Sequence, residues 1–324
     1  EALSEAGNYK KGKTKINNDK PRMLLIEEPE SFLHPPAIRA AREALYKIAE
    51  MQNWQVMITT HSPIFIDVSK PHTTIIRVDK DIDSKTRIFS TEKANFDEDE
   101  RQRLQMIRMC NPSINEFFFA NNIILVEGDT EQTVLNYIKS INSKYTGIQI
   151  VNCRGKANIP MFMKILNHFG LSYTAIHDID APYSMRKEKK VKNAMWTINE
   201  KIFNESRIKN GMDNMIIANM PDFEFQYFKY LQRGDKPYNA ICELRKVEFI
   251  NSDRYEELVN ILESIISRKH SRSIKSIDDY YRLLSKYVKE EIPEPKEIWQ
   301  LDEYKQAFKE VSVTEEITVD NIKK

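Results

Sequence analysis

Two groups of acidic residues in the middle of the chain have the spacing of a site for divalent cations. Glu127 closes an apolar run, and Glu131 lies four residues on, one helical turn later. Asp178 and Asp180 follow another apolar run and are two residues apart, so both point the same way from a strand end. Because parallel strands end at one edge of their sheet, we expect these four carboxylates to share one crevice.

Carboxylates crowded in this way repel one another, which is costly unless a cation lies among them. Mg²⁺ or Mn²⁺ suits them, because hard ions prefer oxygen ligands. Two such ions can clamp the attacking and leaving oxygens of a phosphodiester. The pattern therefore predicts a two-metal site that cuts phosphodiesters, with Glu127, Asp178 and Asp180 as catalytic residues. The alternative is a set of helix caps and solvent-facing acids, which is less favoured because both groups follow apolar runs of one strand–helix–strand pattern.

A second pair of acids lies earlier in the chain and could act on a nucleotide. Glu27 and Glu28 end the apolar run 23–26, and His61 follows the run 56–60. Glu27 could hold Mg²⁺ through water, and Glu28 could orient the water that attacks a γ-phosphate, which His61 could touch. Acids also end buried strands simply where the chain reaches solvent, so the pair alone does not decide between these interpretations.

The apolar runs also predict the elements that must position these residues, and their order is that of an α/β fold with parallel strands. Strands are expected at 23–26, 56–60, 123–126, 148–151, 173–176 and 215–218, and helices at 36–51, 130–141 and 158–169. Thr130 is expected to cap the second of these helices. Between and after them we expect paired strands within 72–90, a helical linker at 93–120, a Lys-rich helical insertion at about 184–210, and a mostly helical region at 241–324.

The overall composition limits the function classes. A chain of 324 residues with 41% apolar residues is long enough for two globular domains. Lys and Arg (49) nearly balance Asp and Glu (48), so any nucleic-acid surface must be local. Cys110, Cys153 and Cys242 lie far apart, which predicts a reduced, cytoplasmic protein without structural zinc or disulfides. No run of about 18 apolar residues predicts a membrane span. The first residue is Glu1, which favours a piece of a longer protein.

The string from Leu24 to Pro35, with Ile58 to Pro63, closely resembles the Walker B segment and His switch of ABC-type ATPases. The similar branch includes the structural-maintenance, recombination and OLD (overcoming lysogenisation defect) proteins. That family also needs a Gly-rich phosphate loop, and Gly12-Lys13-Thr14 lacks its spacing and its preceding strand. Leu3-Ser4-Glu5-Ala6-Gly7 stays open as a degenerate ABC signature. Residues 1–92 are therefore expected to be the C-terminal part of an ATPase domain, with ATP as a cofactor of the full-length protein.

The acids of the first site resemble those of the Toprim domain, which topoisomerases, bacterial primases and OLD-family nucleases share. Val126-Glu127-Gly128-Asp129-Thr130-Glu131 is similar to its strand-one motif, and Asp178-Ile179-Asp180 to its Asp-x-Asp. The cysteines exclude the zinc module of primases, and no tyrosine context identifies a topoisomerase. An ATPase part followed by a Toprim domain, here residues 121–240, is the domain order of OLD-family nucleases.

The resemblance extends to residues that the spacing alone does not assign. It implies that Glu224 is an additional metal ligand and that Lys236 neutralises charge in the transition state. Lys156 is expected to contact DNA, and His177 to support the neighbouring acid. The best basic cluster for DNA is formed by Arg186, Lys187, Lys189 and Lys190, and its alternative is a solvated helix face.

The function that the resemblance implies is metal-dependent cutting or nicking of double-stranded DNA, controlled by nucleotide bound in the ATPase domain. It also implies a homo-oligomer, either a dimer or a tetramer. Some similar proteins, the Gabija type, act in anti-phage defence beside a helicase-like partner protein. Two alternatives belong to other classes. One is a regulatory or assembly module that binds DNA without cutting, and the other is a DNA-repair ATPase of the recombination class, which residues 121–240 disfavour.

Overall fold

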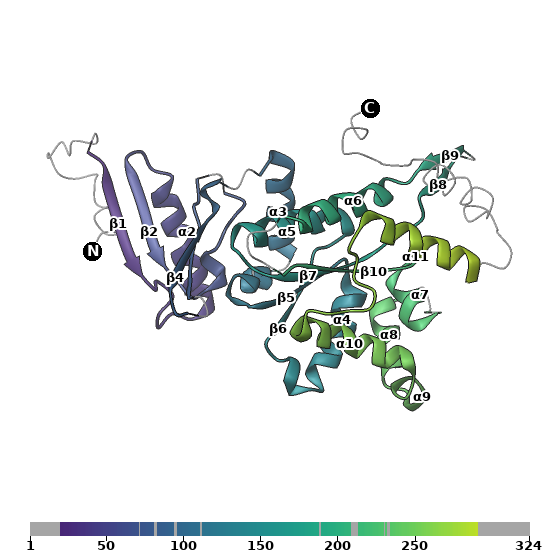
Figure 1. The fold of residues 1–324 in the computed structure, drawn as a ribbon. Helices are drawn as coiled ribbons and strands as arrows, with labels where there is room; N and C mark the ends of the chain where they lie inside the picture. Colours follow the sequence, from purple (N-terminus) through teal and green to yellow (C-terminus); the bar gives the residue numbers. More distant parts are fainter. Residues whose placement is uncertain are drawn as a thin grey trace. The chain divides into compact units, whose positions relative to one another are not determined.

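The computed structural model describes residues 20–70, 72–80, 83–93, 96–110, 112–187, 189–208, 213–229, 231 and 234–290. The candidate signature at 3–7 and the Gly12-Lys13-Thr14 string lie outside these residues. The chain forms two compact units that divide between Asp67 and Val68 (Figure 1).

The first unit contains the predicted strand–helix–strand arrangement. Strands β1 (Arg22–Glu27) and β2 (Trp54–Thr59) pair in parallel, and helix α2 (Pro35–Ala49) connects them. The helix begins where Pro35 occupies its first turn and the His34 side chain accepts a hydrogen bond from the Ala37 amide. Its apolar face predicted this helix to within two residues at each end.

Side chains of the two-stranded sheet alternate between half-buried and exposed positions. Met23, Leu25 and Met57 stand on the exposed positions, with exposed fractions of 57%, 65% and 53%. One face of this small sheet is therefore apolar and bare among the residues that the structure describes.

The second unit is built on a parallel sheet of four strands in the order β10-β7-β5-β6. Their bounds are β5 (Asn122–Val126), β6 (Ile148–Asn152), β7 (Tyr173–Asp178) and β10 (Met215–Asn219). Each strand is a nearly continuous apolar run because both faces of the sheet are covered. At the outer edge of β10, the Ile274 amide donates to the Ile216 carbonyl at 2.9 Å, so a later segment closes that edge.

Helices cover both faces of this sheet and enclose the core (Figure 1). One face packs with α4 (Asp129–Ser140), α7 (Phe223–Phe228), α8 (Lys236–Leu244) and α10 (Asp253–Ser267). The other contacts α5 (Ile159–His168) and α6 (Ala194–Ser206). Short α9 (Val247–Ile250) and α11 (Ile277–Glu290) complete the helical region, which was predicted from 241 onward and is described as far as 290. No helix among the described residues is long and apolar enough to cross a membrane.

The compact units divide earlier than the expected end of the ATPase part at residue 92. The hairpin of β3 (Ile76–Lys80) and β4 (Thr86–Ser90) lies in the second unit, where Arg77 donates to the Phe169 carbonyl at 3.2 Å. The expected linker is also part of this unit. Its helix α3 (Glu98–Cys110) buries Leu104 and Ile107, and a 3-10 segment (Pro112–Phe119) follows.

The prediction of a helical insertion at about 184–210 is wrong for its first part. Strands β8 (Tyr183–Arg186) and β9 (Lys189–Lys192) form an antiparallel hairpin, and only then does α6 begin. The helix starts late because Asn193 is its N-cap, accepting a hydrogen bond from the Met195 amide at 3.0 Å. The expected cap Thr130 was also wrong, since Gly128 occupies the N-cap position of α4 and Thr130 is buried in its first turn.

Candidate active site

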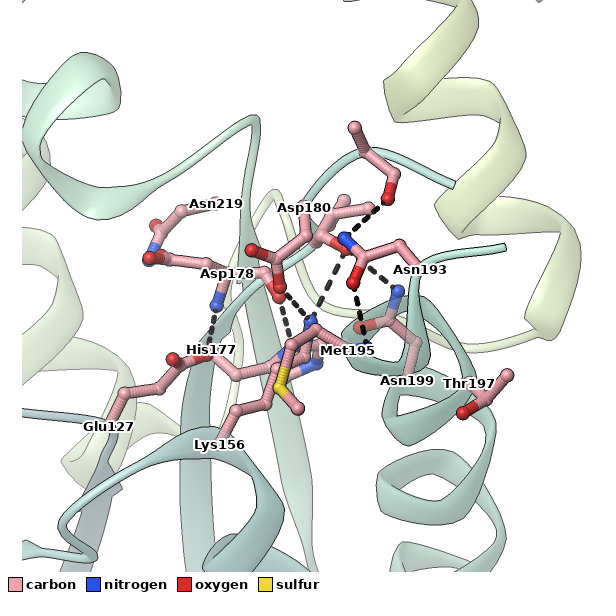
Figure 2. A network of polar contacts seen from close by, with 12 residues as sticks. Glu127, Lys156, His177, Asp178, Asp180, Asn193, Met195, Thr197, Asn199 and Asn219 are labelled. Carbon is pink, nitrogen blue, oxygen red and sulfur yellow. Dashed lines mark hydrogen bonds and ion pairs between the residues drawn. The ribbon is translucent and has the colours of Figure 1, made fainter. Parts of the chain in front are cut away.

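The predicted acids of the second unit meet where its parallel strands end. Glu127 follows β5 and Asp178 ends β7, and these strands are neighbours in the sheet. The Asp178 amide donates to Glu127 Oε1 at 2.7 Å, and Asn219, at the end of β10, donates to Asp178 Oδ1 at 3.3 Å (Figure 2). The topology thus places the two carboxylates side by side at one edge.

Two helices add further acids to this edge, and a third helix adds a lysine. Glu131 lies in the first turn of α4 and is only 6% exposed, and Glu224 lies in the first turn of α7. Lys236, the first residue of α8, places its ammonium 3.0 Å from Glu224 Oε1. The charges of Glu224 and Lys236 both affect the pKa of Glu131, so these three residues belong to one cluster.

Burial holds the protons on these acids more firmly than water would. It raises the pKa of Glu127 to about 8 and that of Glu131 to about 7, both from 4.5. Burial also raises the pKa of Asp178 well above its usual range, and the nearby charges of Glu127 and Glu131 add to the effect. Ionising all of these acids at once would therefore place more negative charge at this edge than its neighbours neutralise.

The chemistry of this cluster fits a divalent cation. Its donors are carboxylate oxygens, which Mg²⁺ and Mn²⁺ prefer, and a cation would offset the charge that burial makes costly. In the arrangement described, no group of three or more His, Cys, Asp or Glu side chains is already placed to hold a metal ion among the described residues. The fit of a divalent cation therefore rests on the carboxylate oxygens of the cluster and on the negative charge that they would carry when ionised.

Lys156 does not occupy the position expected of a DNA contact. Its side chain is only 2% exposed, and its Nζ lies 2.6 Å from Asp180 Oδ2 and 3.3 Å from the Ile179 carbonyl oxygen. The preceding Gly155 has φ of +119°, a conformation that favours glycine, and the loop directs the lysine inward. The prediction that Lys156 contacts DNA is corrected, because a buried, paired ammonium does not face a DNA backbone.

His177 connects this edge to the last described helix. Its Nδ1 lies 3.0 Å from the Asp178 carbonyl oxygen and its Nε2 lies 3.0 Å from the Tyr280 hydroxyl in α11. A carbonyl only accepts, so Nδ1 carries the hydrogen and Tyr280 donates to Nε2. Burial lowers the pKa of His177 to about 3, which keeps the ring neutral. The sequence suggested a supporting role for His177 but gave no signal for Tyr280, which lies 103 residues away.

Replacing Tyr280 with phenylalanine tests this support. The substitution leaves the fully buried His177 Nε2 without its donor, which should lower the free energy of unfolding by about 1–3 kcal/mol in urea titrations. Tyr238→Phe is the matched control because Tyr238 is 64% exposed, and it should change stability by less than about 0.5 kcal/mol. Equal effects of the two variants would contradict a special role for the Tyr280 hydroxyl.

The basic cluster lies on the β8–β9 hairpin, whose base adjoins Asp180. Arg186 pairs with Lys189, and Lys190 with Met185, in the register of the two strands, while the side chains of Lys187 and Lys189 are exposed. Asn193 closes the base, because its amide donates to the Pro182 carbonyl and its side chain to the Ala181 carbonyl, both at 2.8 Å. The hairpin is therefore anchored immediately beside Asp180.

In the first unit, the structure brings together two of the three predicted ATPase residues. Glu28 Oε1 lies 3.6 Å from His61 Nε2, and Glu28 has φ of +42°. Glu27 ends β1 on an exposed position. The sequence did not identify Glu30, whose Oε1 accepts hydrogen bonds from Thr60 Oγ1 and from the His61 amide, both at 2.7 Å. Glu30 thus ties the ends of the two strands together.

Comparison with known proteins assigns both units. Residues 118–180 match the family model of the Toprim domain of overcoming lysogenization defect-like proteins, and residues 5–66 match that of an AAA ATPase domain. The chain is 27% identical over 196 residues to the OLD nuclease of Thermus scotoductus, covering 59% of this chain and 34% of that protein. It is 32% identical over 172 residues to the Old nuclease of Escherichia phage P2, covering 49% of this chain and 28% of that protein. It is 28% identical over 151 residues to endonuclease GajA of Bacillus cereus, covering 39% and 21% respectively.

These matches confirm the predicted resemblance to OLD-family proteins and the predicted fold class, an ATPase part followed by a Toprim domain and C-terminal helices. The chain spans about a third or less of the length of these curated relatives. The Toprim match includes Glu127, Glu131, Asp178 and Asp180, whereas Glu224 and Lys236 lie beyond it. Their place in the cluster rests on the structure.

Proposed function

We propose that this chain is the nuclease-bearing part of a longer, metal-dependent DNA endonuclease. The observation that carries the proposal is the meeting of buried and half-buried carboxylates from two parallel strands and two helices at one sheet edge. Clusters of this kind are costly to a fold unless a cation is used, so strongly perturbed acids in one place support a functional site. The names of the relatives, two OLD nucleases and one endonuclease, support the same activity.

In this proposal the chain's own residues divide the work. Glu127, Glu131, Asp178 and Glu224 hold Mg²⁺ or Mn²⁺, which when bound polarises a phosphodiester and lowers the pKa of water. Lys236 offsets negative charge that develops on the phosphate. Its side chain is 45% exposed, so an arriving phosphate could reach it, and Glu224 holds it in place.

Control by nucleotide belongs to the same proposal. The first unit carries Glu27, Glu28 and His61 and part of an AAA ATPase match, and nucleotide bound in the complete ATPase domain would regulate cleavage. A dimer or tetramer, a helicase-like partner and a role in anti-phage defence remain parts of the proposal. The oligomer and the helicase-like partner rest on the family resemblance of the sequence alone.

The β8–β9 hairpin is the proposed DNA contact, and charge reversal tests it. Lys187 and Lys189 are exposed at the turn of this hairpin, whose base adjoins Asp180, so each can neutralise a backbone phosphate. The double variant Lys187→Glu, Lys189→Glu should weaken binding to duplexes of any sequence. Fluorescence-anisotropy titrations should also show a smaller salt dependence. The slope of the logarithm of the DNA association constant against the logarithm of the salt concentration should become less steep by about 2.

A charge-matched control separates a local contact from a change in overall charge. The double variant Lys201→Glu, Lys269→Glu alters two exposed lysines on α6 and after α10, away from the hairpin. It should leave the salt slope within experimental error of the unchanged protein. If both double variants lose affinity equally, the hairpin is not the DNA contact.

The activity itself is tested with supercoiled plasmid. Incubation with Mg²⁺ or Mn²⁺ should produce nicked or linear DNA, and a chelator should stop the reaction. DNA binding without any strand cleavage, under conditions where Mn²⁺ binds, would favour the alternative of a non-cleaving assembly module.

A further inference from the structure

Lys156 is a buried cation inside a cluster that was expected to hold two metal ions. The loop after β6 carries it across the end of β5, because the Cys153 amide donates to the Val126 carbonyl and the Gly155 amide to the Glu127 carbonyl. From there its ammonium reaches Asp180 Oδ2 at 2.6 Å, beyond the end of β7 (Figure 2). It therefore spans from the β6 side of the sheet edge to the β7 side.

The buried ammonium is held from several directions. Its second acceptor is the Ile179 carbonyl oxygen at 3.3 Å, which also accepts a hydrogen bond from Asn199 Nδ2 at 3.0 Å. Asn158 braces the loop, because its Nδ2 donates to the Cys153 carbonyl at 2.9 Å and to the Arg154 carbonyl at 3.0 Å. Moving Lys156 away from Asp180 would leave an unpaired charge in a buried position, which is costly.

The two lysines of the site serve different acids. Lys236 pairs with Glu224, and its charge also affects Glu131. Lys156 pairs with Asp180, and its charge also affects Glu127. Asp178 has a hydrogen bond to one oxygen from Asn219 and no ion pair with either lysine among the described contacts. The negative charge left for a dissolved cation therefore lies between Glu127, Glu131 and Asp178, away from the Asp180 oxygen that Lys156 contacts.

We propose that Lys156 is a built-in counter-cation for Asp180 that takes the place of a second divalent ion, so that the site binds one ion tightly. A dissolved ion at Asp180 must compete with a cation that the chain itself delivers at a high local concentration. In place of the two-metal site expected from the sequence, one tight ion would lie among Glu127, Glu131, Asp178 and Glu224, with one weak ion at most. This inference rests on the proposed function, because it assumes that the cluster binds a divalent cation.

Counting bound Mn²⁺ by electron paramagnetic resonance tests this inference without measuring activity. The unchanged chain should bind one Mn²⁺ tightly. Lys156→Met removes the charge but keeps a long side chain, and it should tighten the second Mn²⁺ by at least about tenfold because Asp180 is released. Lys156→Arg keeps the charge and should behave like the unchanged chain.

The outcomes distinguish this inference from the proposed function. Two equally tight ions in the unchanged chain, or a second site that Lys156→Met leaves unaltered, would overturn the role of Lys156 while the nuclease proposal stands. No tight Mn²⁺ at all would overturn both. Asp180→Asn provides a second route if Lys156→Met does not fold: the tight ion should persist, and its loss would overturn the inference because Asp180 would then be a ligand of that ion.

Discussion

Replacing Asp178 with asparagine should lower the rate of plasmid cleavage by about 10³-fold or more while leaving the chain folded. Asp178 ends β7 beside Glu127, and burial together with the neighbouring acids raises its pKa well above the usual range. Asparagine has the same shape and keeps an oxygen that can accept from Asn219, so the geometry of the edge is preserved. Only the negative charge is lost, and with it the ability to hold a divalent cation.

Asp178→Asn should also change stability, in the opposite direction to its effect on cleavage. Burial penalises a charged Asp178, so the neutral asparagine should keep or raise the free energy of unfolding in the absence of metal. Glu256→Gln, an exposed acid at the start of α10, is the control and should change neither cleavage nor stability measurably. A rate within about tenfold of the unchanged chain for Asp178→Asn would show that the site has been assigned wrongly.

Metal-free chain should lose stability as the pH rises from about 7 to about 8.5, and Mg²⁺ should reverse this trend. The pKa of Glu127 is raised to about 8 in the folded state from 4.5, and that of Asp178 is raised well above its usual range. The folded state therefore holds protons that the unfolded chain has already released. The stability that they contribute is present below the unfolded pKa and is lost as pH rises through the folded pKa.

Between pH 7 and pH 8.5, His177 and His270 do not change their charge in the folded state. The pKa values of His177 and His270 are lowered to about 3 and about 4, so they remain neutral when folded and lower stability only below their unfolded value of 6.5. Above about pH 7 the raised pKa values of the acids determine how stability changes with pH. Each proton that the folded state holds in excess should lower the free energy of unfolding by about 1.4 kcal/mol per unit of pH. Urea titrations at several pH values, with and without Mg²⁺, measure the slope.

A variant that lacks one of these acids should show a flatter dependence of stability on pH. Glu127→Gln removes the group that titrates at about 8 and should reduce both the metal-free slope and the stabilisation by Mg²⁺. Metal-free stability that rises between pH 7 and pH 8.5 would contradict the assigned burial of these acids.

Much of this site could be predicted because its residues follow the regular spacing of strands and helices along the chain. Apolar runs fixed the strands to within about two residues, and parallel strands necessarily end at one edge, so Glu127 and Asp178 had to lie close together. Glu131 followed from the spacing of one helical turn. These inferences need only strand and helix periodicity and the rule that parallel strands share a direction.

The rest depends on features that no local pattern encodes. The inward path of Lys156 follows from the conformation of Gly155 and from partners on another strand, so its basic side chain was mistaken for a surface contact. The hairpin at 183–192 was taken for a helix because lysines suit both elements, and only the cap at Asn193 separates them. Pairing across long sequence separations, as between His177 and Tyr280, becomes visible only in the folded chain.

The distance in sequence between those two residues also sets when the site can be completed during synthesis. Asp178 and its neighbour His177 leave the ribosome 103 residues ahead of Tyr280, the residue that fastens the histidine ring. At about 5–20 residues per second, that interval lasts roughly 5–20 s. During it, the acids already exist on a partly folded chain whose supporting helix has not yet been made. Under the proposed function, the cutting centre would therefore stay incomplete until Tyr280 has been made.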